Sequence, residues 1–167
     1  MRQIVLSALL CLATLSAACA NGWETFDHDL GAGAAVCPYD DAETGALFCF
    51  AIACLEAGGP VYIRIAVAGS TLDQQMPPLQ IVVDGKPVAR LFLDLLDTDD
   101  MLDFAKPLDR ERDADLVIAL VEGSRAMLVL GVGPSALIQE VTLRGSASAL
   151  KAVPALCDQR PIVSEPD

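Results

Sequence analysis

The chain has 167 residues, of which 53% are hydrophobic and 5% aromatic, and its formal net charge is −12 at pH 7. This length suits one domain that buries a core of its own. The negative charge argues against nucleic-acid binding, which needs a basic surface, and against attachment to anionic lipid surfaces.

Residues 1–20 have the features of a secretory signal peptide. Arg2 supplies a positive charge, and residues 4–15 form an apolar stretch that is too short to span a bilayer comfortably. Ala18 and Ala20 fit an A-x-A cleavage site, so we expect the mature chain to begin at the next residue. Cleavage there would change the net charge to −13, because Arg2 is the only charged residue removed.

The alternative for this N-terminus is a lipid anchor on Cys19. Ser16 occupies the position where a lipobox has an aliphatic residue, which favours the soluble form. No later stretch reaches the roughly 18 continuous apolar residues of a membrane span. We therefore expect a periplasmic or secreted protein.

Four cysteines follow the predicted cleavage site, namely Cys37, Cys49, Cys54 and Cys157. An even number in an oxidising compartment favours two disulfides over a redox pair or a zinc site, whose characteristic spacings are missing. Residues 47–54 resemble a strand, in which Cys49 and Cys54 would point to opposite faces and so bond different partners. We expect Cys37–Cys49 with Cys54–Cys157, and the alternative is Cys37–Cys54 with Cys49–Cys157.

The first half of the predicted domain contains strands separated by turns. Residues 21–46 are polar and are interpreted as loops around a short strand that ends near Cys37. Residues 47–54 form an apolar run typical of a buried strand, and residues 61–69 alternate like a half-buried strand.

A β-hairpin is predicted at the centre of "LQIVVDGKPVARLFL". Asp84-Gly85 lies between two β-rich runs, and this dipeptide favours a type I′ turn, in which both central residues have positive φ. Pro87 lacks a backbone N–H, so the second strand should lie at a sheet edge.

The segment 109–123 predicts a helix, with Asp109 as its N-cap and Gly123 just past its end. Before it, "DLLDTDD" is interpreted as a polar loop and "MLDFAKPL" as a short strand. After it, residues 124–132 and 136–144 predict an antiparallel pair.

The last predicted element is a C-terminal helix of one or two turns in "GSASALKAVPALC". Ser146 is its expected cap, and Pro154 is expected to keep it short. Residues 158–167 are interpreted as a disordered tail. A signal peptide (1–20) would thus precede one disulfide-containing domain (21–157).

Antiparallel strands dominate this pattern, and strands and helices do not alternate as they do in parallel α/β sheets. The predicted fold class is mainly β, either a β-sandwich or a twisted antiparallel sheet. One interior helix and a short C-terminal helix complete it.

One cluster of carboxylates is the candidate cation site. Closely spaced carboxylates are calcium ligands, but the segment lacks the central glycine and closing glutamate of an EF-hand. We therefore interpret it as a solvated loop and predict no metal and no cofactor. A basic protein partner is the other use considered for this cluster, which consists of Asp94, Asp97, Asp99, Asp100 and Asp103.

No catalytic residues are predicted. The chain has a single histidine, His28, in a polar stretch, and no serine lies in a G-x-S-x-G elbow. A surface histidine without a catalytic role is the favoured interpretation.

Three segments carry a resemblance to a known family. They are "LFCFAIAC" after an earlier cysteine, "IVVDGKPV" at mid-chain, and "VTLRGSASALKAVPALC" before the tail. Together they resemble the invasion-associated locus B family of small exported alphaproteobacterial proteins, although this chain has only Trp23 where that family has a tryptophan-rich N-terminal strand. The resemblance implies a periplasmic β-rich domain without an assigned catalytic site, and it transfers no functional residues.

The leading functional hypothesis is a non-enzymatic exported domain that binds a protein or an envelope component. A second hypothesis is an acidic inhibitor of a cationic hydrolase such as a lysozyme or a protease, since opposite charge speeds encounter. A third is a carboxylate-dependent hydrolase.

Overall fold

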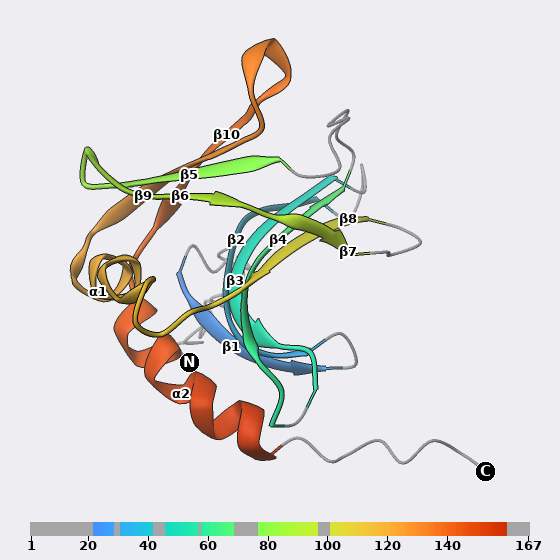
Figure 1. Cartoon of the computed structure of the whole chain (residues 1–167), viewed down its shortest axis with the longest axis vertical. Helices are drawn as coiled ribbons and strands as arrows, with labels where there is room; N and C mark the ends of the chain where they lie inside the picture. The colour runs from blue at the N-terminus through green and yellow to red at the C-terminus, as the bar shows by residue number, and fades with distance from the viewer. Residues whose placement is uncertain are drawn as a thin grey trace, which may run out of the picture.

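A computed structural model describes residues 22–28, 31–41, 46–56, 58–68, 77–96 and 101–159. The expected signal peptide and residues 160–167 of the expected tail lie outside these ranges. The described part is mainly β, as the sequence predicts, and its strands form two antiparallel sheets (Figure 1).

The larger sheet has six strands in the order β1-β2-β3-β4-β8-β7, and every neighbouring pair is antiparallel. The first four strands follow the chain order, and the β7–β8 hairpin adds to β4. The strands are β1 (Glu24–His28), β2 (Gly31–Asp41), β3 (Ala46–Cys54), β4 (Val61–Ala68), β7 (Asp94–Leu96) and β8 (Leu102–Pro107).

The smaller sheet has four strands in the order β10-β9-β5-β6 and is also antiparallel. Its strands run in a clearly different direction from those of the larger sheet in Figure 1. Both sheets contribute to a single hydrophobic core, so the molecule is a β-sandwich. The strands are β5 (Pro78–Val83), β6 (Lys86–Phe92), β9 (Arg125–Leu130) and β10 (Leu137–Thr142), with a 3₁₀ turn η1 (Gly133–Ser135) between the last two.

The two helices are α1 (Ala114–Glu122) and α2 (Ser146–Gln159), and they lie beside each other at one side of the sandwich (Figure 1). α2 packs mainly on β2 of the larger sheet. Its buried residues Ala149, Val153 and Cys157 recur every four positions, which gives the helix one apolar stripe.

The predicted central hairpin is confirmed. Asp84 has φ 47° and Gly85 has φ 80°, the two positive values that a type I′ turn requires. β6, which contains Pro87, lies at an edge of the smaller sheet as expected. The expected pairing on either side of residues 133–135 is also present, as β9 and β10.

The prediction for residues 21–46 is wrong, because this region holds two strands, β1 and the eleven-residue β2. The small residues of β2 gave a weak strand signal, but they allow a close approach to β3. A Cβ added at Gly33 would lie 2.3 Å from the Ile52 carbonyl oxygen. In the same way, the first residues of the expected "DLLDTDD" loop form the short strand β7, whereas residues 97–100 lie outside the described part.

The predicted helix at 109–123 begins later than expected, at Ala114. Asp109 caps a preceding turn, where its Oδ1 accepts the N–H of Glu111 (3.1 Å) and of Arg112 (3.0 Å). The bond from the backbone N–H of Arg112 is the main cause that lowers the pKa of Asp109 from its usual 3.8. The chain thus turns once before it becomes helical.

The C-terminal helix is longer than predicted, with fourteen residues that include Pro154. Pro154 lies on the exposed side, while Val153 and Cys157 are held in the core, so packing outweighs the lost hydrogen bond. Ser146 is not the expected side-chain cap. Its buried hydroxyl lies 2.6 Å from the Leu120 carbonyl oxygen and donates toward it, which joins the two helices.

Candidate functional site

The larger sheet has an inner face that is packed and an outer face that is hollowed. On the inner face, Phe50 of β3, Ile65 of β4 and Phe104 of β8 lie in one row and are fully buried. The neighbouring outer row consists of Ala35, Ala51, Arg64 and Ala105, whose positions alternate with the core residues along each strand. Small side chains on this outer face leave room above the sheet.

This room is a hollow of about 330 Å³. Its floor is formed by Ala35, Ala51 and Ala66 on three neighbouring strands. Phe26 and His28 of β1 line one side, and their rings are stacked with centroids 4.9 Å apart. The site is therefore mainly apolar, with an aromatic wall supplied by the edge strand.

A disulfide forms another part of the wall. Cys37 of β2 and Cys49 of β3 are bonded, with Cα atoms 4.1 Å apart, and both line the hollow. The bond links two adjacent strands at the place where their register shifts, between Val36 and Tyr39. It therefore fixes the wall where the strand ladder is irregular.

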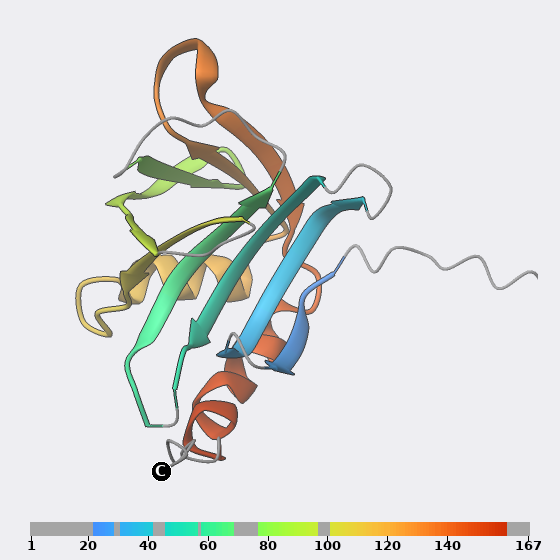
Figure 2. The same cartoon turned by 90° about the vertical axis from the view of Figure 1, so that its right-hand side faces the viewer.

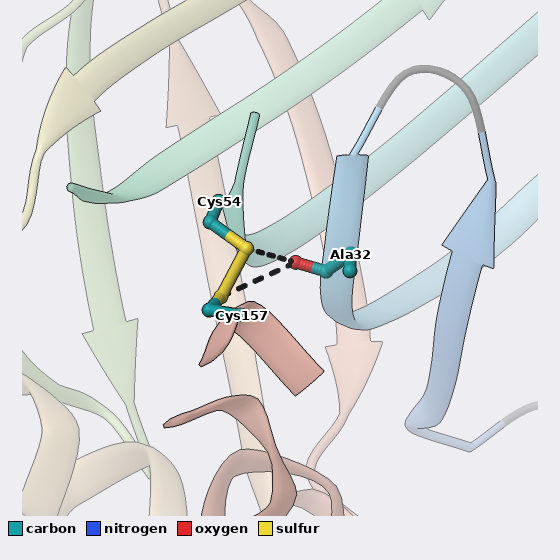
Figure 3. Close-up of a disulfide and its surroundings, with 3 residues drawn as sticks. All are labelled: Ala32, Cys54 and Cys157. Atoms are coloured by element: carbon teal, nitrogen blue, oxygen red, sulfur yellow. Dashed lines mark hydrogen bonds between the residues drawn. A yellow bond between two sulfur atoms is a disulfide. The ribbon is translucent and has the colours of Figure 1, made fainter. Parts of the chain in front are cut away.

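The second disulfide joins Cys54 of β3 to Cys157 of α2 on the inner face, where both cysteines are buried (Figure 3). Their sulfurs lie 3.3 and 3.8 Å from the carbonyl oxygen of Ala32. A disulfide sulfur carries no proton to donate, so we interpret these distances as close packing. Both expected pairings are confirmed, and Cys49 and Cys54 lie on opposite faces of β3 as predicted.

An ion pair also lines the hollow. The guanidinium of Arg64 on β4 contacts both carboxylate oxygens of Asp103 on β8, and the two side chains are 11% and 3% exposed. A Cβ added at Gly31 would lie 3.0 Å from Nη1 of Arg64, so the glycine leaves space for this side chain. Burial of a charged pair is tolerated when each partner satisfies the other.

The carboxylates that the sequence groups together are placed in different surroundings. Asp103 is a buried partner of Arg64 and lines the hollow, so its assignment to a solvated loop is wrong. Asp94 is exposed on β7, and Asp97, Asp99 and Asp100 lie outside the described residues. Within the described ranges, no three His, Cys, Asp or Glu side chains are grouped so that they could hold a metal ion. A cation site at this cluster stays untested.

The hollow was not predicted from the sequence. Its signal is the alternation in β3, where Ala51 and Ala53 follow Phe50 and Ile52. The residues that pair with these two alanines on β2, Ala35 and Gly33, are small as well. Alternation of small residues with large ones indicates a sheet face that is not filled by its own side chains. His28, expected as a surface residue, is exposed at the rim, and its lack of a catalytic role stays a prediction.

Similarity to a known protein is found among solved structures. No protein-family model and no curated protein sequence matches this chain. Among solved structures, the chain is similar to the crystal structure of invasion associated protein b from Bartonella henselae, at 19% identity over 80% of this chain and 97% of that chain, with a TM-score of 0.41. This is the family that the sequence motifs resemble. None of the helices in the described ranges is long and apolar enough to cross a membrane.

Proposed function

We propose that this protein is an exported, non-enzymatic binding domain of the bacterial periplasm. In this proposal, the hollow on the outer face of the larger sheet receives an apolar side chain of a protein partner. The observation that carries it is the alanine floor, because Ala35, Ala51 and Ala66 create a concave apolar surface on a rigid sheet.

The size of the hollow supports a side chain better than a large ligand. Pockets for drug-sized molecules enclose roughly 300–1,000 Å³, and this hollow of about 330 Å³ is at the lower end. An aromatic or branched side chain fits within such a volume, and buried aromatic anchors carry much of the energy of protein interfaces. The stacked rings of Phe26 and His28 offer a surface for such an anchor.

The surroundings of the hollow favour recognition without chemistry. The charge of Asp103 is already engaged by Arg64, so the carboxylate is a fixed wall in this proposal and no general acid or base. The net charge of −12 would speed the approach of a basic partner. An inhibitor of a cationic hydrolase is a special case of this function, with a lysozyme or protease as the partner.

Filling the hollow tests the proposal. The oxidised chain from residue 21 onward is used to capture proteins from periplasmic extract, and the Ala51→Phe variant is compared with it by quantitative mass spectrometry. Because the phenylalanine occupies the space above the floor, we expect the specific partner to be recovered at least tenfold less. The control is Ala155→Phe, which adds the same side chain at an exposed position of α2 and should retain the partner. Equal recovery by Ala51→Phe and the unmodified chain would exclude the hollow as the binding site.

A further inference from the structure

The four edge strands of the two sheets differ in how they are protected against pairing with another chain. β1 is short and carries the exposed residues Glu24 and Asp27, and β7 has only three residues, one of which is Asp94. β6 contains Lys86 and Pro87, and the ladder beside it has a register shift. Charges, proline, bulges and short length are the usual means of keeping a sheet edge from adding a strand.

β10 lacks these protections. Its six residues pair with β9 in continuous register, and Leu137–Thr142 contains no lysine, arginine or proline. Ile138 is 67% exposed, the highest fraction among the large hydrophobic side chains of the described residues. The single charge, on Glu140, lies 3.6 Å from the guanidinium of Arg125 on β9. This edge is therefore longer than β1 and β7, and unlike β6 it has no proline and no register shift.

The position of β10 makes its edge accessible. The hairpin formed by β9 and β10 projects beyond the rest of the molecule in both Figure 1 and Figure 2. At the opposite end of β10, the N–H of Trp23 donates to the Arg144 carbonyl oxygen at 3.0 Å, which places Trp23 beside that end. Ile138 is the second residue of β10 after the η1 turn at the tip, and Glu140 follows two positions later.

The backbone of Ile138 and Glu140 faces away from β9. The N–H of Leu143 donates to the Ser124 carbonyl oxygen, and the carbonyl oxygen of Arg125 accepts from Asp84 on the other side of β9. Backbone groups alternate direction along a strand, so the odd-numbered residues of β10 bond to β9 and the even-numbered ones point outward. The carbonyl oxygen of Glu140 accepts only the exposed side-chain amide of Gln139, at 2.9 Å, among the bonds within the described residues. An incoming strand can replace this bond.

A second hollow adjoins this edge on the outer face of the smaller sheet. It encloses about 260 Å³, with Met127 and Val82 as apolar lining and the side chains of Asp84, Arg125 and Glu140 around it. Two carboxylates and one guanidinium give this hollow a net negative charge. A lysine or arginine suits it, because its aliphatic stem can cover Met127 while its head reaches Glu140.

We propose that β10 is a docking edge that adds an extended segment of a basic partner protein as a fifth strand of the smaller sheet. Two residues of the added strand are specified by their neighbours on β10. One is an apolar residue beside Ile138, and the other is a lysine or arginine beside Glu140, two positions away on the same face. Main-chain hydrogen bonds to the outward groups of Ile138 and Glu140 supply affinity, and the two side chains supply specificity.

This docking edge is separate from the alanine-floored hollow, which lies on the other sheet. A second copy of this chain is the less favoured occupant. Pairing of six residues buries less surface than the roughly 1,200 Å² of a stable interface. The net charge of −12 also opposes self-association and favours a basic segment.

A synthetic peptide tests the proposal with the oxidised chain from residue 21 onward. The probe is a blocked, dye-labelled peptide of eight residues in which serine alternates with isoleucine, lysine, valine and threonine in that order. Its binding is measured by fluorescence anisotropy against the same peptide with glutamate in place of lysine. We expect the lysine peptide to bind at least tenfold more tightly.

Two proline variants locate the binding edge. Ile138→Pro removes an outward N–H from β10 and should weaken binding of the lysine peptide at least tenfold, while the sheet's own ladder is unaffected. Arg90→Pro is the matched control on the protected edge β6. The N–H of Leu93 bonds back to Pro77, so the N–H of Arg90 points outward there, and its loss should change binding less than twofold. Ile138→Lys, which retains every backbone group and adds a repelling charge, serves if the proline variant fails to fold.

Three results would overturn the proposal. They are equal affinity for the lysine and glutamate peptides, undiminished binding by both Ile138 variants, and no binding at millimolar peptide. A dimer in sedimentation analysis that dissociates with Ile138→Lys would also overturn it, because a second copy would then be the occupant of the edge.

Discussion

The two sheets of the sandwich are held in register by different means. In the larger sheet, one disulfide joins β2 to β3 and another joins β3 to α2, so β3 is covalently tied near its middle, at Cys49, and at its last residue, Cys54. The smaller sheet contains no cysteine. Its register depends on the Asp84-Gly85 turn and on the Asp84 carboxylate, which accepts the N–H of Ser124 (3.0 Å) and of Arg125 (3.1 Å).

The difference follows the composition of the strands. β2 and β3 contain many glycines and alanines, which have low strand propensity and bury little apolar area. β5 and β9 are rich in valine, leucine and isoleucine, which pack well in a sheet. The larger sheet, with its hollowed outer face, is thus supported by two disulfides. The smaller sheet, which has larger side chains, is supported by the Asp84-Gly85 turn.

Removal of the buried disulfide should have the largest effect. In the chain-entropy relation, a cross-link that spans 103 residues stabilises a protein by about 5 kcal/mol. We expect the double variant Cys54→Ala, Cys157→Ala to lose this amount in urea unfolding and to release α2 from β2. If removal of Cys54–Cys157 lowered the free energy of unfolding by less than removal of Cys37–Cys49, the explanation based on loop length would be contradicted.

Removal of the disulfide in the wall of the hollow should cost less. The same relation gives about 3 kcal/mol for a separation of 12 residues, which we expect for Cys37→Ala, Cys49→Ala in the same urea experiment. In the unmodified chain, mild reduction should release these two half-buried thiols before the buried pair, as mapped by alkylation and mass spectrometry. Release in the reverse order would show that burial does not protect the inner disulfide.

The turn of the smaller sheet should respond to a change of one residue. Gly85→Val is expected to destabilise the protein by roughly 1 kcal/mol or more, because a β-branched residue resists positive φ. A Cβ at this position has no neighbour within 4 Å, so the effect comes from the backbone and not from a clash. Lys86→Val, one residue further on, is the control and should leave the melting temperature nearly unchanged. An equal melting temperature for Gly85→Val would mean that the turn does not determine the register.

The smallest effect is expected at the turn that leads from β8 to α1, in the connection between the two sheets. Backbone N–H groups, chiefly that of Arg112, lower the pKa of Asp109 in the folded protein, so the ionised carboxylate favours folding. This contribution is present above the usual value of 3.8 and is lost as the pH falls through the lowered pKa. As the pH is lowered through this range, the melting temperature of Asp109→Ala should therefore decrease less than that of the unmodified chain. NMR titration that gives Asp109 a pKa at or above 3.8 would contradict the role of these bonds.

Sequence reasoning succeeded where a local signal has one physical meaning. The Asp84-Gly85 turn could be predicted because the dipeptide favours positive φ, while strand alternation argued against a Cys49–Cys54 bond and left two disulfide pairings open. It failed where tertiary packing overrides local preference, as in the glycine-rich strand β2 and in α2, where Pro154 lies on the exposed side. The hollow depends on residues from several strands, and Asp103 is buried only because β8 places it beside Arg64.

The order of the cysteines along the chain has a consequence for how the protein matures. In the export that we propose, the chain emerges from its N-terminus, so Cys37, Cys49 and Cys54 would all reach an oxidising compartment before Cys157. The β2–β3 hairpin would bring Cys37 and Cys49 together early. Cys54 would remain a thiol until its partner Cys157, which lies 103 residues further along the chain, has emerged. Formation of the hairpin would thus direct Cys37 to bond Cys49 in preference to Cys54, the other thiol of β3. In that order of events, the Cys54–Cys157 bond would form last, when α2 has reached β3.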